Sequence, residues 1–125
     1  MLIITHGEIG EQLVKTATST LGGKLPLQCR ALSVSQSCDP DALGQRASNI
    51  LTEMSDDDEL LVLTDMYGST PSNIANRLSE THKVRVIAGV NLPMFIRILN
   101  YPTLELDELI EKALSGGHDG IILCE

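Results

Sequence analysis

Apolar and polar residues follow two different rhythms along this chain, and together they predict a mixed α/β fold. Short apolar runs rich in β-branched residues are typical of strands buried in a parallel sheet. Longer segments in which apolar residues recur every three or four positions are typical of helices that bury one face. The runs that we expect to be strands cover residues 1–5, 26–34, 60–64, 84–88 and 120–123. The segments that we expect to be helices cover residues 8–21, 40–54, 71–78, 93–99 and 104–114.

The boundaries of these segments carry residues that helices use to begin and end. Asp39 and Pro40 suit the N-cap and the first residue of the second helix, and Pro71 suits the first turn of the third. Glycine pairs at residues 22–23 and 116–117 are expected to end the first and last helices. The alternation predicts a doubly wound, mostly parallel sheet of four strands with a short C-terminal edge strand and helices on both faces. We expect a single domain that spans residues 1–125.

The composition argues against several classes of function. A net charge of −8 and an aromatic content of 2% disfavour binding to nucleic acid. No apolar stretch approaches the roughly 18 residues that a membrane-spanning helix needs, so no membrane insertion is expected. The three cysteines, Cys29, Cys38 and Cys124, form no C-x-x-C motif, which favours reduced thiols in the cytoplasm. The acidic run at residues 55–59 lacks the spaced ligands and the glycine of a calcium loop, and we interpret it as a solvated loop.

Two residues with chemical potential follow the first and third expected strands. His6 lies between the first strand and the first helix, and Asp65 follows the third strand. In a doubly wound sheet whose order reverses at the first strand, these two strands are neighbours, and their carboxyl ends bring His6 and Asp65 side by side. A carboxylate that accepts the proton of one imidazole nitrogen leaves the other nitrogen free to attack. Taken singly, His6 also has a structural interpretation and Asp65 is equally a turn former.

The residues around this pair suit a phosphoryl group. Gly7 and the helix that begins after it present backbone amides to an anion, and the hydroxyls of Ser69 and Thr70 are candidate donors to phosphate oxygens. Ser69 and Thr70 have a second interpretation as a helix cap before Pro71. Residues 89–93, after the fourth strand, either contribute to the site or form a plain strand-to-helix loop. The chain has no G-x-x-x-x-G-K-[ST] or G-x-G-x-x-G motif, so we expect no nucleotide, metal ion or other cofactor.

Three sequence blocks together resemble the mannose-type enzyme IIA family of the bacterial phosphoenolpyruvate:sugar phosphotransferase system. They are Thr-His-Gly at 5–7, Leu-Thr-Asp-Met-Tyr-Gly-Ser-Thr-Pro-Ser-Asn at 63–73, and Ala-Gly-Val-Asn-Leu-Pro-Met at 88–94. The resemblance covers essentially the whole chain. It implies a phosphotransferase in which His6 takes a phosphoryl group from the phosphocarrier protein HPr, forms a transient phosphohistidine, and passes the group to a IIB component in sugar uptake or its regulation.

The resemblance also implies roles for the neighbouring residues and an assembly. Asp65 matches the carboxylate that orients the histidine ring, and Thr70 stands where the family usually has a phosphate-contacting serine. Ser69 stands where glycine is common, so this loop departs from the family pattern. The family fold is a doubly wound sheet, commonly in a homodimer that exchanges an antiparallel last strand. Residues 120–123 are placed to be that strand.

Other functions remain open from the residues alone. A response-regulator-like receiver, phosphorylated on Asp65, needs an acidic pair after the first strand, where this chain has Thr5 and His6. The phosphotransfer subunit of dihydroxyacetone kinase shares the fold and the early histidine, but residues 65–73 and 91–93 look more like the sugar-transport branch. A stand-alone regulatory IIA protein, whose phosphorylation state is the signal, is not separated from a transport component by the sequence.

Overall fold

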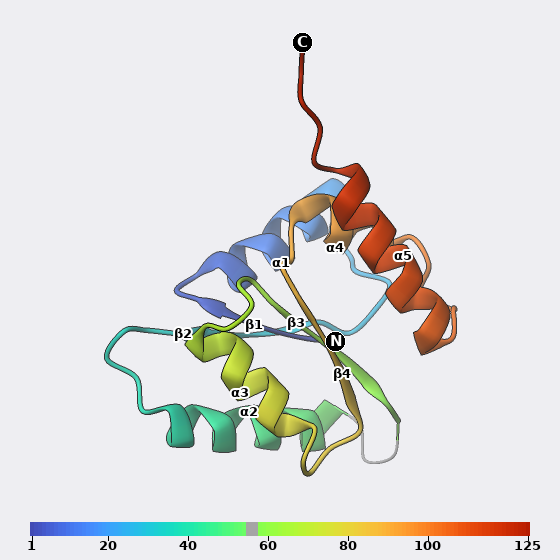
Figure 1. Ribbon diagram of the computed structural model, residues 1–125. Helices are drawn as coiled ribbons and strands as arrows, with labels where there is room; N and C mark the ends of the chain where they lie inside the picture. The colour runs from blue at the N-terminus through green and yellow to red at the C-terminus, as the bar shows by residue number, and fades with distance from the viewer. Residues whose placement is uncertain (55–57) are drawn as a thin grey trace.

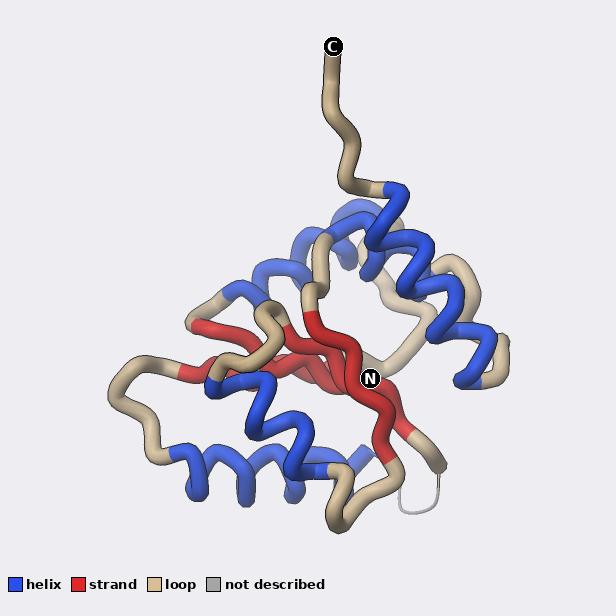
Figure 2. The backbone as a smooth tube through the Cα atoms, in the orientation of Figure 1, coloured by secondary structure: helices blue, strands red, loops and turns tan. Residues whose placement is uncertain are grey.

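The computed structural model describes residues 1–54 and 58–125, which build a parallel sheet between two layers of helices (Figures 1 and 2). The strands are β1 (Leu2–His6), β2 (Arg30–Val34), β3 (Leu60–Thr64) and β4 (Val84–Ala88). Their order is β2-β1-β3-β4, and every neighbouring pair is parallel. The order therefore reverses at β1, which confirms that β1 and β3 are neighbours in a doubly wound sheet.

The helices cover both faces of the sheet (Figure 1). They are α1 (Ile9–Thr20), α2 (Pro40–Met54), α3 (Thr70–Leu78), α4 (Leu92–Leu99) and α5 (Leu106–Asp119). Because side chains of a strand alternate between faces, Ile3 packs with α1, α4 and α5, whereas Leu2 and Ile4 pack with α2 and α3. Both faces of β1 are therefore buried, which explains the run of three apolar residues from Leu2 to Ile4.

The edge strand β2 is shorter than the predicted strand at residues 26–34. Pairing with β1 begins where Leu2 faces Arg30 and ends where His6 faces Val34. Residues 26–29 have no neighbouring strand to pair with, because β2 lies at the edge of the sheet and β1 begins only at Leu2. The exposed Arg30 agrees with an edge position.

The prediction that a glycine pair ends the last helix is wrong. The helix α5 runs through Gly116 and Gly117 to Asp119. A Cβ atom on Gly116 would lie 2.8 Å from Cβ of Arg97, and one on Gly117 would lie 2.9 Å from Cε of Met94. These glycines therefore allow close contact between α5 and α4, which is a packing requirement and not a helix stop.

The predicted strand at residues 120–123 is not found in the single chain. The segment leaves the end of α5 and extends away from the sheet (Figure 1), and Ile121, Ile122 and Leu123 are 75%, 72% and 83% exposed. A strand needs a neighbour for its backbone hydrogen bonds, and within the described part of the chain the segment has none. Its pairing with another subunit stays a prediction.

Two further sequence predictions concern polar and membrane segments. The solvated loop predicted at residues 55–59 falls largely on residues 55–57, which lie outside the described residues. Among the helices that the structure describes, none combines the length and apolar character required to cross a bilayer.

Candidate functional site

The residue at the sheet's reversal point is His6, the last residue of β1. Its Nδ1 lies 2.8 Å from Oδ2 of Asp65, and its backbone N–H donates to the same oxygen at 3.1 Å. One carboxylate oxygen therefore holds both the main chain and the ring of His6. An ionised carboxylate only accepts hydrogen bonds, so Nδ1 carries the proton in this pair and Nε2 of the neutral ring has a free lone pair.

The sheet brings Asp65 to this position. Ile4 faces Thr64 in the register of β1 and β3, so Asp65 continues β3 beside the last residues of β1. The end of β3 is fixed by two backbone hydrogen bonds, in which Gly89 and Val90 donate to the carbonyl of Thr64 at 2.9 and 3.0 Å. The side chain of Asp65 is 12% exposed, whereas that of His6 is 45% exposed. The orienting group is thus sheltered while the ring remains accessible from solvent.

The turn between β1 and α1 is fixed by two hydrogen bonds, one to β2 and one within the turn. Gly7 has φ of +48°, which favours glycine, and its N–H donates to the carbonyl of Val34 at 3.0 Å. The buried hydroxyl of Thr5 accepts from the N–H of Gly10 at 2.8 Å, in the first turn of α1, where the N-cap residue Glu8 makes no side-chain cap. The amide of Gly7, predicted to bind phosphate, is therefore already bonded within the fold.

The predicted phosphate-binding hydroxyls lie in the segment that follows Asp65. Ser69 is the N-cap residue of α3, and its Oγ donates to the carbonyl of Met66 at 2.5 Å, which closes the loop. Thr70 is the first residue of α3 and is exposed. Both residues belong to the carboxyl edge of the sheet, as predicted, but among the described residues no hydrogen bond joins either of them to His6.

The loop after β4 has a structural role that the sequence left open. Asn91 caps α4 by accepting from the N–H of Met94 at 2.9 Å, and its Nδ2 donates to the carbonyl of Gly117 at 3.2 Å. Both ends of this amide are used to join α4 to α5. Residues 89–91 therefore form a strand-to-helix loop that fixes α4, and Leu92 and Pro93 begin the helix.

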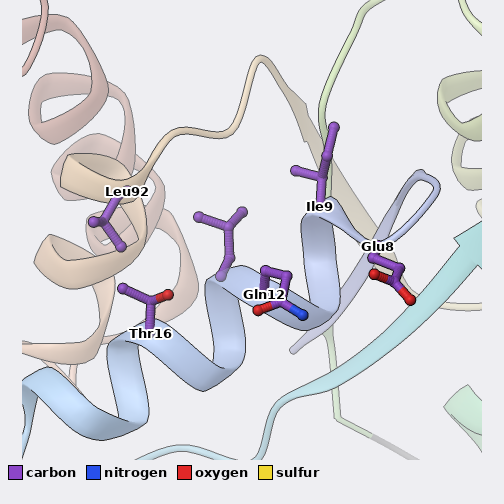
Figure 3. A pocket seen from close by; sticks show the side chains of 6 residues that line it. Glu8, Ile9, Gln12, Thr16 and Leu92 are labelled. Carbon is purple, nitrogen blue, oxygen red and sulfur yellow. The ribbon is translucent and has the colours of Figure 1, made fainter.

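Several apolar side chains are exposed around the site, and the groove beside it was not predicted from the sequence. Ile9, the first residue of α1, is 49% exposed, and Leu92 is 37% exposed. Met66 and Tyr67, which follow Asp65, are 60% and 83% exposed. Between α1 and α4 lies a groove of about 500 Å³, which Figure 3 shows from close by. Its lining residues are Glu8, Ile9, Gln12, Leu13, Thr16 and Leu92.

The arrangement suits nucleophilic chemistry at His6. It offers an accessible imidazole nitrogen, a carboxylate on the opposite nitrogen, and a helix that begins directly after the turn. Within residues 1–54 and 58–125, no cluster of three or more His, Cys, Asp or Glu side chains is placed to hold a metal ion.

Known proteins resemble this chain in sequence and in fold. The family described as "PTS system fructose IIA component", where PTS is the phosphotransferase system, matches residues 1–114. The mannose-specific EIIAB component of the PTS from Escherichia coli (strain K12) is 30% identical over 124 residues, which cover 97% of this chain and 38% of that protein. The fructose-specific EIIA component from Bacillus subtilis (strain 168) is 32% identical over 77 residues, 58% of this chain and 53% of that protein. The chain thus spans well under two thirds of the length of these relatives.

Solved structures extend this similarity to the whole fold. The mannose/sorbose specific IIA subunit of the phosphotransferase system from Enterococcus faecalis superposes with a TM-score of 0.89 and is 26% identical, covering 99% of this chain and 92% of that chain.

Proposed function

Because this chain belongs to the mannose/fructose IIA family of the PTS, we propose that it is a phosphoryl carrier in sugar uptake or its regulation. In this proposal His6 accepts a phosphoryl group from phosphorylated HPr and passes it to a IIB component. The observation that carries the proposal is the 2.8 Å contact between Nδ1 of His6 and Asp65, since it leaves Nε2 as the nucleophile. We propose that residues 1–125 form one phosphotransfer domain. We also propose that this domain works in the cytoplasm.

The proposed transfer exchanges one phosphorus–nitrogen bond for another. The lone pair of Nε2 forms a bond to phosphorus while the bond to the donor's histidine nitrogen breaks, and the electron pair of that bond stays on the donor's imidazole. Nδ1 of His6 keeps its proton, so the phosphorylated ring gains positive charge, which the carboxylate of Asp65 stabilises. The rest of the catalysis is in-line positioning of the two partners. In the second step the nucleophile of the acceptor attacks phosphorus, and His6 returns to its neutral form.

The proposed phosphate ligands differ in whether their donor groups already form hydrogen bonds within the protein. Thr70 is exposed at the start of α3, so its hydroxyl is available to a phosphoryl oxygen without loss of another contact. Ser69 would have to release the carbonyl of Met66, and the amide of Gly7 would have to release that of Val34. We therefore propose Thr70 as the main phosphate ligand, with Ser69 and Gly7 shaping the two turns.

We also propose a homodimer that exchanges residues 120–123. Two observations support it: the segment is apolar and exposed, and among the described residues β4 is an edge strand with one unpaired side. An exposed strand edge is a ready template for pairing with another chain.

The proposed function is tested by incubation with phosphoenolpyruvate, enzyme I and HPr, followed by mapping of the phosphorylated residue. We expect phosphate on Nε2 of His6, stable in alkali and labile in acid, and no phosphorylation of a folded His6→Ala variant. Lability in both acid and alkali would indicate an acyl phosphate on Asp65 and would favour a receiver-like switch. A protein that HPr leaves unphosphorylated would contradict the proposal as a whole.

A further inference from the structure

Thr5 carries a buried hydroxyl one residue before the proposed nucleophile. Because side chains alternate along a strand, Thr5 shares with Ile3 the face of β1 that α1 covers. Its side chain is fully buried, and its Oγ1 accepts a hydrogen bond from the backbone N–H of Gly10 at 2.8 Å. This hydrogen bond joins the end of β1 to the start of α1.

The hydroxyl of Thr5 takes the place of the side-chain cap that α1 lacks. The N-cap residue of a helix usually accepts from an N–H of the first turn through its side-chain oxygen. Here the N-cap residue is Glu8, which makes no such bond, and the N–H of Gly10, the second residue of the helix, is bonded to Thr5 instead. The first turn of α1 is thus held by the strand that carries His6.

Gly10 lets the helix approach the strand closely enough for this bond. A Cβ atom on Gly10 would lie 3.2 Å from Cγ2 of Ile3 and 3.2 Å from Oγ1 of Thr5. Contacts this short crowd a side chain, whereas the hydrogen atom of glycine leaves room. The contact is therefore built from both elements, with a residue that lacks a side chain on the helix and a hydroxyl on the strand.

The hydrogen bond between Thr5 and Gly10 closes a turn that contains His6. On the side of β2, the N–H of Gly7 donates to a backbone carbonyl at 3.0 Å, and on the side of β3, the N–H of His6 donates to Asp65 at 3.1 Å. The bond from Gly10 to Thr5 fixes the remaining side, toward α1. Because Oδ2 of Asp65 contacts both the backbone and the ring of His6, a shift of the main chain would also change the ring contact.

We propose that Thr5 is a positioning residue for phosphoryl transfer at His6. Through its bond to Gly10, it holds the main chain of His6 so that Nε2 stays in line with an incoming phosphorus atom while Asp65 keeps its contact with Nδ1. Thr5 takes no part in bond making, since its hydroxyl is buried on the α1 side of the sheet. In-line transfer is sensitive to displacements of about 1 Å, so a small change in this turn affects the rate. This inference rests on the function proposed above.

The inference is tested by single-turnover phosphorylation with phosphoramidate, a small phosphoryl donor that needs no protein docking surface. Thr5→Val keeps the branched shape of the side chain and removes the oxygen that accepts from Gly10. We expect its rate to fall by about tenfold or more, because the turn around His6 gains freedom. Thr5→Ser keeps the oxygen and loses only a methyl group, so its rate should stay within about twofold of that of the unaltered protein. Gly10→Ala disturbs the same contact from the helix and should also slow the reaction.

A spectroscopic measurement and a matched control separate positioning from stability. In Thr5→Val, the ¹⁵N shifts of the His6 ring should move toward those of a mixture of the two tautomers, because a looser main chain weakens the contact of Nδ1 with Asp65. The control is Thr18→Val, which removes a hydroxyl that donates to the carbonyl of Val14 at 2.7 Å, nearer the other end of α1. Urea denaturation identifies conditions in which each variant is folded. Under those conditions, Thr18→Val should match the unaltered protein in rate and in ¹⁵N shifts.

The positioning role of Thr5 predicts one pattern of results, and any other pattern contradicts it. A Thr5→Val variant with an unaltered rate or unaltered ¹⁵N shifts would overturn the inference, and so would a Thr5→Ser or Thr18→Val variant as slow as Thr5→Val. If Thr5→Val does not fold, the rate and ¹⁵N shifts of Gly10→Ala decide in its place. If the unaltered protein accepts no phosphate from HPr, the proposed function fails, and the ¹⁵N shifts still test whether Thr5 positions the ring of His6. If it accepts phosphate normally and Thr5→Val matches it, only the inference fails.

Discussion

At the scale of single residues, the reactivity of His6 depends on which ring nitrogen keeps the proton. Oδ2 of Asp65 accepts from the backbone N–H of His6 at 3.1 Å and lies 2.8 Å from Nδ1. The backbone bond fixes where the carboxylate lies, and the ring contact then fixes the tautomer. In the proposed mechanism, the two bonds to one oxygen make Asp65 a positioning residue for Nε2.

Replacing Asp65 by Ala should remove the group that fixes this tautomer. Without the carboxylate, the ring also populates the tautomer with its proton on Nε2, which lacks the nucleophilic lone pair. We expect the single-turnover rate of His6 phosphorylation to fall by roughly 10²-fold or more, as for other positioned acid–base groups. The ¹⁵N shifts of the His6 ring should report the change of tautomer in the free protein. An Asp65→Ala variant with the same rate would reduce Asp65 to a turn former.

The sequence predicted this pair but not the contacts that surround it. His6 and Asp65 could be paired because strand order alone brings the ends of β1 and β3 together. Two hydrogen bonds depend on how the helices lie against the sheet, which local sequence patterns do not encode. They join the hydroxyl of Thr5 to the N–H of Gly10 and the side-chain amide of Asn91 to the carbonyl of Gly117. The hydrogen-bond partners of such polar side chains could therefore be identified only from the folded structure.

At the scale of helices and strands, apolar periodicity identified elements more reliably than glycine identified their ends. The strands at residues 60–64 and 84–88 agree with prediction, because both are short segments dominated by apolar residues. Gly116 and Gly117 were misread, since the same residue type serves both to end a helix and to admit a neighbouring one. Which role applies depends on α4, a separate segment of the chain.

Gly116→Ala should therefore destabilise the fold through the α4–α5 contact. The new Cβ would lie 2.8 Å from Cβ of Arg97, so one of the two helices must shift. We expect a loss of about 1–3 kcal/mol in the free energy of unfolding, measured by urea denaturation. The matched control is Gly44→Ala in α2, where no atom lies within 4 Å of the new Cβ and where helix propensity predicts a gain of up to about 1 kcal/mol. Equal effects in the two variants would contradict the packing role.

At the scale of the whole molecule, stability should fall in alkali because of one buried thiol. Burial raises the pKa of Cys29 from 9.0 to about 11. The folded state then holds the thiol proton of Cys29 more tightly than the unfolded state. The contribution of this thiol to the free energy of unfolding is therefore fully present below pH 9 and is lost as the pH rises to about 11. The loss is at most about 2–3 kcal/mol, since one pKa unit corresponds to about 1.4 kcal/mol. Urea denaturation at pH 8, 9.5 and 11 should give a steeper decline for the unaltered protein than for Cys29→Ala, and parallel declines would contradict this assignment.

The exposed C-terminal segment, residues 120–123, leads us to expect that the protein forms a dimer. Burial of the apolar side chains of Ile121, Ile122 and Leu123 against another surface would stabilise the protein. The free edge of β4 can supply strand hydrogen bonds that this segment does not make within the described part of one chain. We expect the full chain to sediment as a dimer at micromolar concentration and a variant that ends at Gly120 to sediment as a monomer.

Charge provides an independent check on this dimer. Each subunit carries a net charge of −8, so association works against repulsion that salt screens. Raising the salt concentration should therefore strengthen the dimer. Phosphorylation by phosphoramidate, a small phosphoryl donor, should be equal in the full and shortened chains, because His6 and Asp65 lie in the same chain. A full chain that remains monomeric at every salt concentration would contradict strand exchange and would leave the chemistry at His6 untouched.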